Sequence, residues 1–392
     1  MNTDAPQTRI DRITPYAPEL AARGPFRIGV RTTMITLQDQ PDVATCAPDG
    51  AERQLPLEIW YPATSDTESG GTYDTLLRCG ETRAVLAGQA RRDAPAAKDL
   101  RAPLVVISHG YPGNRYLMVH LAESLAAEGY VVAACDHTGS TYDNQADFGS
   151  TLLHRPLDQC GILAAMGVMG GDIGALVDCS NAGLIGYSMG GYGALITGGA
   201  GLTKTAVDFQ RAPPARLLER HVAGSNSHTA LMDNRFKAII TIGPWGGLYG
   251  MWDAEGLAAL KIPALIMAGT NDTVSGYGAM RDIFEAATGV DRHLLSFQHA
   301  GHNAAAPYPA PEASYAVSGK LGWAPFEHYG DPVWDTVVMN NIAQHYATAF
   351  FGLHLKQNTD MAAYLEDGFR GFRDGTSTGL RFESRNRERD NG

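Results

Sequence analysis

The chain has 392 residues, of which 44% are hydrophobic and 19% are charged, and its formal net charge is −11. Such a length allows one large or two modest domains with a sizeable core. The acidic balance argues against a nucleic acid partner, because phosphate binding requires clustered lysine and arginine. The sequence also has no run of about 18 apolar residues, so a membrane-spanning segment is not expected.

The five cysteines and the N-terminal segment bear on the cellular compartment. The cysteines form no C-x-x-C pair and their number is odd, which disfavours a zinc site and a disulfide framework. Residues 1–20 lack the apolar core of a signal peptide. We therefore expect a cytoplasmic protein that holds no metal.

The first quarter of the chain is expected to lie at the edge of the fold. Residues 1–25 are polar and contain prolines, which predicts an arm over the surface. Alternating apolar and polar residues over Phe26–Leu37 and Gln54–Tyr61 predict two antiparallel edge strands. The polar segment 65–100 has one patch, near Leu76–Gln89, that we interpret as helical.

A strand-helix-strand unit is predicted next. Pro103–Ser108 is a short continuous apolar run, typical of a strand buried on both faces. An amphipathic helix over Leu117–Glu128 and a second apolar run over Tyr130–Cys135 follow. This order of elements implies a parallel sheet.

The alternation of strands and helices continues through a single α/β domain, 26–373. The expected elements are a helix over 152–168, strands over 183–186, 238–242, 264–268 and 292–297, and helices over 254–260, 277–287 and 333–355. Two segments interrupt this order: 201–234, which we interpret as a lid insertion, and the long loop 304–331. The tail 374–392 is expected to be disordered.

The stretch Gly186-Tyr187-Ser188-Met189-Gly190 fits G-x-S-x-G, the strand-turn-helix elbow that presents a nucleophilic serine at the edge of a sheet. The serine backbone in such an elbow is strained, and side chains two residues before and after it would collide, so both positions require glycine. Because the chain has 45 glycines, a chance match is the alternative. The preceding apolar strand and the small residues Gly190–Ala194 favour the nucleophile.

An elbow serine needs an acid and a base, which follow it in chain order, each after a late strand. Asp272 directly follows the apolar run Ile262–Met267, and His302 directly follows Leu294–Phe297. Both residues therefore belong to the same edge of the sheet as Ser188. We predict Asp272 as the acid and His302 as the base.

Each of these two assignments has a competitor. Asp272 also suits a helix cap, and Asp253 and Asp291 are weaker candidates for the acid. His299 is as close to its strand as His302. We favour His302 because the glycine before it allows a tight turn to present the ring.

The oxyanion of an acyl-transfer intermediate needs two backbone donors. One is predicted to be the N–H of Met189, the residue after the nucleophile. The other is predicted to come from the turn His109–Gly113, and we choose Tyr111 because Pro112 has no N–H. A plain glycine-rich connection is the alternative for this turn. His109 and His137 precede the elbow and are expected to hold loops by hydrogen bonds.

Aromatic residues follow another strand end and recur in the late loop. We predict an apolar substrate pocket lined by Trp245, Tyr249, Trp252 and Trp323. Packing of these loops onto the sheet is an equal alternative.

Four stretches together resemble the α/β-hydrolase superfamily: the elbow Gly186–Gly190, the turn His109–Gly113, Leu57–Pro62 and Asp136–Thr141. Within it they are similar to the branch that groups dienelactone-hydrolase-like proteins with platelet-activating-factor-acetylhydrolase-like serine esterases. The resemblance runs from about Phe26 to Leu355. It implies a mostly parallel sheet flanked by helices and a Ser-Asp-His carboxylic ester hydrolase without metal or cofactor. True dienelactone hydrolases have a cysteine nucleophile, so Ser188 argues against their substrate.

The predicted function is hydrolysis of a small or medium hydrophobic ester through an acyl-enzyme. The expected partner is this small molecule, with no nucleic acid and no membrane, and a homo-oligomer is allowed. Because His302 must be neutral to accept a proton, we expect activity to fall on acidification. The same triad also serves a lactonase, thioesterase, amidase or acyltransferase, and a non-catalytic binding protein on this scaffold is a further alternative.

Overall fold

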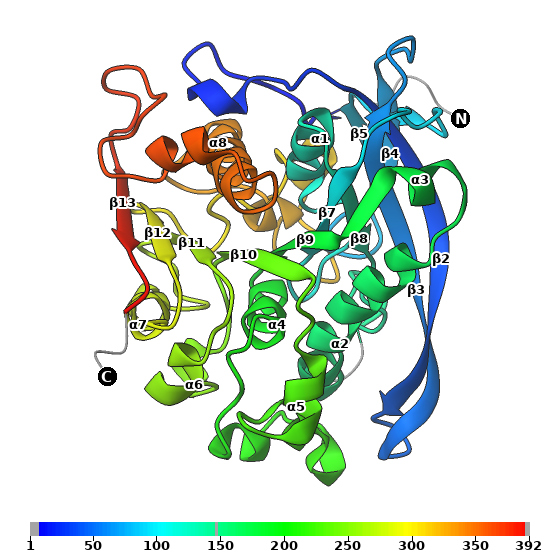
Figure 1. Cartoon of the computed structure of the whole chain (residues 1–392), viewed down its shortest axis with the longest axis vertical. Coiled ribbons are helices and arrows are strands. Elements are labelled where there is room, and N and C mark those ends of the chain that lie inside the picture. Colours follow the sequence, from blue (N-terminus) through cyan, green and yellow to red (C-terminus); the bar gives the residue numbers. More distant parts are fainter. Residues whose placement is uncertain (1–7, 146–147, 389–392) are drawn as a thin grey trace.

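A computed structural model describes residues 8–145 and 148–388, and its centre is a ten-stranded sheet with helices on both faces (Figure 1). The strands, in their order across the sheet, are β13 (Leu380–Arg385), β12 (Arg292–Phe297), β11 (Ala264–Gly269), β10 (Phe236–Ile242), β9 (Val177–Tyr187), β7 (Ala102–Ser108), β8 (Val131–Cys135), β3 (Ala47–Ala63), β2 (Arg27–Asp42) and β6 (Arg91–Arg92). The six strands from β12 to β8 are parallel, and β13 and β3 pair with them antiparallel. The predicted mostly parallel α/β sheet is thus confirmed.

The apolar runs of the parallel strands follow from burial on both faces of the sheet. Along β7, Val105 and Ile107 belong to one hydrophobic core, whereas Leu104 and Val106 belong to the other. Successive side chains of a strand point to opposite faces, so a strand between two cores has no polar side. This is why Pro103–Ser108 reads as a continuous apolar run rather than as an alternation.

Helices cover the two faces separately (Figure 1). On one face α1 (Val119–Ala127) packs against α8 (Thr336–His354), and both contribute to the first core. The other face is covered by α2 (Phe148–Gly167), α4 (Met189–Thr197), α6 (Ala254–Ala258) and α7 (Tyr277–Ala286), with the short α3 (Gly171–Leu176) before β9. No helix in the described ranges is both long enough and apolar enough to cross a bilayer.

The segment predicted as a helical patch, Leu76–Gln89, is instead part of a second, three-stranded sheet. Its strands are β1 (Thr8–Arg9), β5 (Arg83–Gly88) and β4 (Gly71–Leu76). Ala84 and Leu86 point into the first core at the spacing of a strand, and the buried carboxylate of Glu123 accepts the hydroxyl of Tyr73 at 2.6 Å. The helical interpretation was wrong because these long-range contacts, not local periodicity, determine the conformation.

The predicted disordered tail is also corrected over most of its length. Strand β13 adds to the edge of the large sheet, where Leu380 and Phe382 are buried in the first core. Glu383 forms an ion pair with Arg281 at 2.6 Å, which further anchors the strand. Two apolar residues at alternate positions are too short a pattern to distinguish from a polar tail. Residues 389–392 lie outside the described residues, as do residues 1–7 of the predicted arm.

The predicted lid, 201–234, is built from two 3-10 helices, Thr205–Asp208 and Pro214–His221, and from α5 (Asn226–Leu231). It lies beside α2 and α4 (Figure 1). His221 donates from Nε2 to the Leu153 carbonyl of α2 at 2.8 Å, which attaches the segment to the domain. The role of this segment as a lid insertion stays a prediction.

Candidate active site

The turn between β9 and α4 has the strained geometry that the sequence predicts. Ser188 has φ 51° and ψ −111°, a backbone conformation that residues other than glycine rarely adopt. A Cβ atom on Gly186 would lie 2.2 Å from the Gly190 carbonyl oxygen, and one on Gly190 would lie 2.0 Å from the Ser108 carbonyl oxygen. Glycine is therefore sterically required on both sides of the serine.

Three of the predicted residues form one hydrogen-bonded chain. His302 Nε2 lies 2.9 Å from Ser188 Oγ, and His302 Nδ1 lies 2.8 Å from Asp272 Oδ2. Asp272 follows β11 and His302 follows β12, so the carboxyl ends of neighbouring parallel strands bring them to the elbow. The structure thus brings together the residues proposed as nucleophile, base and acid, whose roles remain predictions.

Asp272 is arranged to stay ionised. Burial raises the pKa of its carboxyl, but the hydrogen bond from His302 and those from the N–H groups of Ser275 and Val274 outweigh burial, so the pKa lies below its ordinary value. A carboxylate that accepts several hydrogen bonds stays ionised, and an ionised carboxylate can only accept the imidazole N–H. The contact therefore favours the tautomer of His302 that has its proton on Nδ1 and a lone pair toward Ser188.

The competing candidates lie elsewhere. Asp253 accepts the N–H of Gly256 and caps α6, while Asp291 accepts the N–H of Arg387 at 2.7 Å. His299 is exposed, with φ 64°, and its backbone N–H donates to Thr270. Of the three candidate aspartates, only Asp272 contacts His302.

The predicted oxyanion donors lie beside the serine. Met189 is the first residue of α4, so its N–H belongs to the group of amides that have no partner within the helix. Tyr111 lies in the turn after β7 and lines the same cleft as Ser188 and His302. A Cβ on Gly110 would lie 3.3 Å from the Cβ of Ser188, which shows how closely the turn approaches the elbow. The donor roles of Tyr111 and Met189 remain predictions.

A cleft of about 690 Å³ opens over Ser188 and His302. Trp245, Tyr249 and Trp323 line it, and their contact with a substrate stays a prediction. Trp245 is the centre of an aromatic wall: Tyr249 stacks on it at 4.7 Å between ring centroids, and Phe148 and Phe209 pack against it at 5.1 and 6.0 Å.

Trp252 is not among the residues that line this cleft. Its indole N–H donates to the Ala200 carbonyl at 3.0 Å, and its ring packs on Tyr192 at 5.7 Å in the second core. A buried tryptophan needs a partner for its N–H, and here the backbone supplies it. For this residue the alternative reading, loop packing, describes its position.

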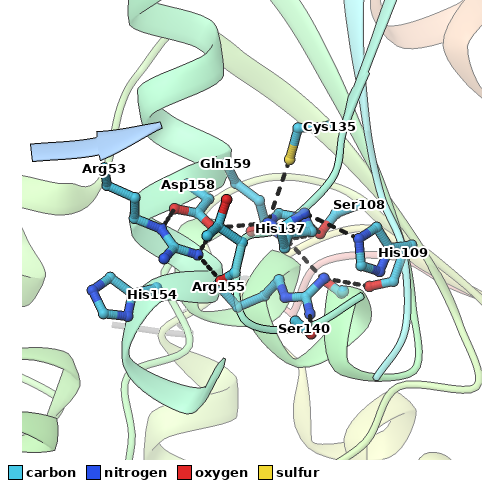
Figure 2. Close-up of polar contacts among 12 residues, drawn as sticks. Arg53, Ser108, His109, Cys135, His137, Ser140, His154, Arg155, Asp158 and Gln159 are labelled. Carbon is cyan, nitrogen blue, oxygen red and sulfur yellow. Dashed lines mark hydrogen bonds and ion pairs between the residues drawn. The ribbon is translucent and has the colours of Figure 1, made fainter. Parts of the chain in front are cut away.

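A second polar cluster adjoins the turn His109–Gly113 (Figure 2). Ser108 Oγ lies 2.8 Å from His137 Nε2, whose Nδ1 lies 2.8 Å from Asp158, and Arg53 contacts both oxygens of Asp158 at 2.6 and 2.9 Å. The order serine, histidine, aspartate is the same as in the hydrogen-bonded series Ser188, His302 and Asp272. Because the serine is 0% exposed and does not line the cleft, a substrate has no access to it.

The cluster reaches the turn through Arg155 and His109 (Figure 2). Arg155 donates to the His109 carbonyl at 2.5 Å and to the Ser140 hydroxyl at 2.6 Å. His109 Nε2 accepts the N–H of His137 at 3.1 Å, so its Nδ1 donates to the Gly110 carbonyl at 2.7 Å. The expectation that His109 and His137 hold loops by hydrogen bonds agrees with these contacts.

Sequence reasoning missed Arg155, Asp158 and Gln159. All three lie in α2 and are at most 1% exposed. Their spacing of three and four residues places them on one face of the helix, a signal that was present in the sequence. Polar residues on the buried face of a helix are costly unless they are paired, so such a stripe points to a built network.

The sheet and the elbow together have the α/β-hydrolase fold. Many solved chains match the structure, and one of them is a ferulic acid esterase from Streptomyces cinnamoneus, with a TM-score of 0.60 and 19% identity over 96% of this chain and 99% of that one. The family described as PET hydrolase-like matches residues 88–213, and platelet-activating factor acetylhydrolase, isoform II, matches residues 21–148. No curated protein sequence gives a significant match. These likenesses, to families and a structure of ester hydrolases, agree with the resemblance inferred from sequence.

Proposed function

We propose that the protein hydrolyses carboxylic esters through an acyl-enzyme on Ser188. The observation that carries this proposal is the chain of 2.9 and 2.8 Å contacts from Ser188 through His302 to Asp272, at the floor of a cleft. The strained backbone of Ser188 destabilises the fold, and such strain is typical of functional sites. A base in contact with the serine can activate it as a nucleophile.

In the first half-reaction, Ser188 Oγ attacks the ester carbonyl carbon and His302 Nε2 takes the hydroxyl proton. The negative oxygen of the tetrahedral intermediate accepts hydrogen bonds from the backbone N–H groups of Met189 and Tyr111. When the intermediate collapses, the C–O bond to the alcohol breaks, and His302 returns its proton to the leaving oxygen. The products of this step are the free alcohol and an ester of Ser188.

In the second half-reaction, water takes the place of the alcohol. His302 removes a proton from the water, whose oxygen attacks the acyl carbonyl. Collapse releases the carboxylic acid and returns the proton to Ser188 Oγ. Asp272 stays a carboxylate throughout and stabilises the imidazolium that forms in each step.

The aromatic wall supports an ester with a hydrophobic part of small or medium size. Phe148, Phe209, Trp245 and Tyr249 offer adjoining ring faces beside the serine. Such a wall buries apolar area without supplying a second reactive group. A lactonase or thioesterase would use the same triad, and the nature of the acyl acceptor distinguishes these activities.

The test combines covalent labelling with hydrolysis. Intact mass is measured after exposure to a fluorophosphonate, together with turnover of short and medium p-nitrophenyl esters. One adduct and measurable hydrolysis are expected in the wild type and in the exposed control Ser180→Ala, and both should disappear in Ser188→Ala. An adduct that persists in Ser188→Ala would place the nucleophile elsewhere. Absence of both adduct and hydrolysis in the wild type would favour the non-catalytic binding protein.

A further inference from the structure

Two arginines line the cleft and form no ion pair among the described residues. Arg78 comes from the turn between β4 and β5, and Arg211 comes from the predicted lid, 201–234. Elsewhere buried carboxylates bind arginine, as Asp158 binds Arg53 at 2.6 Å. The cleft thus keeps two guanidinium groups that are not neutralised by a neighbouring carboxylate.

An aromatic ring lies beside each of the two arginines. The guanidinium carbon of Arg211 lies 3.9 Å from the centroid of the Phe148 ring, and that of Arg78 lies 5.7 Å from the centroid of the Trp323 ring. Stacking uses the face of the planar guanidinium and leaves its N–H donors around the edge. Those donors suit the two oxygens of a carboxylate, which they bind as a planar pair.

The backbone around Arg78 is fixed, which makes it the better anchor. Its N–H donates to the hydroxyl of the buried Tyr329 at 3.0 Å, and its side chain is half-buried, whereas Arg211 is exposed. A charge that is partly shielded from water interacts more strongly with a ligand than an exposed charge does. Arg78 is therefore the residue expected to make the directed contact, with Arg211 adding positive charge at the opening.

The overall charge of the chain makes this local arrangement informative. With a net charge of −11, the protein as a whole repels an anion, so an anionic ligand depends on charges near the site. The lining contains one acidic residue, Glu327, which is exposed to solvent and forms no ion pair with either arginine in the described structure. The fixed charges of the lining are thus positive on balance.

We propose that the substrate is an ester that carries a carboxylate in addition to its ester bond, and that Arg78 binds this carboxylate. The inference rests on the proposed function of Ser188 and adds the class of substrate. The aromatic wall then contacts the apolar part of the molecule, and the arginine determines which end enters the cleft.

The test compares esters that differ only in a carboxylate. The first pair is p-nitrophenyl octanoate and the mono-p-nitrophenyl ester of suberic acid, with the charge on the acyl side. The second pair is phenyl octanoate and 4-carboxyphenyl octanoate, with the charge on the alcohol side. We expect kcat/KM in the wild type to be higher for the anionic member of at least one pair, and this preference to shrink as salt is added.

Variants then connect the preference to Arg78. Because a hydrogen bond to a charged group is worth a tenfold to hundredfold change, Arg78→Gln should lower the ratio of anionic to neutral kcat/KM by about 10- to 100-fold. Arg78→Lys should lower it less, since the charge stays and the planar pairing is lost. The control is Arg83→Gln, an exposed arginine paired with Asp74 outside the cleft, for which the ratio should not change.

The outcomes separate this inference from the proposed function. If the wild type hydrolyses the neutral esters through Ser188 but prefers neither anionic ester, the substrate class is wrong and the esterase stands. A preference that survives in Arg78→Gln and in Arg78→Lys would equally overturn the role of Arg78. The salt dependence in the wild type needs no variant, so a folding defect in Arg78→Gln does not remove the test.

Discussion

Asp158 and His137 form a buried pair in which the carboxylate lies 2.8 Å from Nδ1 of the imidazole. The same distance joins Asp272 to His302 at the cleft. The two pairs differ in their access to solvent, since the first is at most 1% exposed and the His302 side chain is 16% exposed. The buried pair Asp158–His137 therefore holds a loop, whereas the pair Asp272–His302 is proposed to take part in proton transfer.

Replacing Asp158 should cost more stability than replacing any surface carboxylate. Burial raises the pKa of Asp158, but Arg53 and His137 outweigh burial and keep the pKa well below its ordinary value, so the group is a buried anion. Asp158→Asn removes the buried charge that the half-buried Arg53 pairs with, which we expect to lower the free energy of unfolding by about 3–5 kcal/mol. Urea denaturation measures the change. Asp74→Asn, in an exposed pair with Arg83, should leave the midpoint almost unchanged; equal effects of both variants would contradict this role.

Arg155 is expected to act on catalysis through the turn His109–Gly113, which is predicted to supply one oxyanion donor. Its guanidinium joins the carbonyl of His109, at the start of the turn, to the Ser140 hydroxyl. Arg155→Met should loosen the turn and lower kcat by about 10-fold, less than the roughly 10²–10³-fold loss on removing an oxyanion donor outright. KM should change little, because the lining side chains stay. Steady-state kinetics at a temperature where the variant is folded measures both constants, and an unchanged kcat in a destabilised variant would make Arg155 purely structural.

Much of the fold was predictable because its signals are local. A strand buried on both faces, such as β7, has a short continuous apolar run that ends at turn residues. The elbow was predictable because the clash at Gly190 depends on residues within a few positions and on the adjoining strand. The positions of Asp272 and His302 followed from the rule that reactive groups lie at the carboxyl ends of parallel strands.

The parts that could not be predicted depend on partners far away in the sequence. Arg53 meets Asp158 across 105 positions, and periodicity contains no information about such a pair. Strand β13 is stabilised by the edge of β12, which a short polar segment does not reveal. Trp252 is another example. It was predicted to line the cleft because it follows a strand, but its indole N–H donates to the distant Ala200 carbonyl and the ring lies outside the cleft.

Several buried histidines predict loss of stability in acid. Burial lowers the pKa of His120 to about 3, and burial together with the charge of Arg155 lowers that of His137 to about 3; burial also lowers the pKa of His221 to about 3. The unfolded chain binds protons at these groups below about pH 6.5, and the folded chain does so only near pH 3. Folding stability is therefore fully present above pH 6.5 and is lost as the pH falls through this window.

The melting temperature between pH 7 and pH 4 measures this loss. Each such histidine contributes a slope of at most about 1.4 kcal/mol per pH unit. His120→Asn should make the slope shallower, because it removes one proton that only the unfolded chain binds. The exposed His299 serves as the control, and His299→Asn should leave the slope as it is. A melting temperature that stays constant over this range would show that the buried imidazoles do not govern acid stability.

The acid of the proposed triad can be identified by three matched substitutions, because the sequence offered three aspartates for this role. Asp272→Asn keeps the shape of the side chain but removes the charge, and its amide favours the tautomer of His302 that donates toward Ser188. The base then has no lone pair for the hydroxyl proton, so kcat should fall by about 10⁴-fold, as is known for such a substitution in a serine protease. Asp253→Asn changes only a helix cap, and Asp291→Asn changes only a contact with the backbone of Arg387. Both should keep kcat within a few fold of the wild type, and a large loss in either of them, with Asp272→Asn active, would reassign the acid.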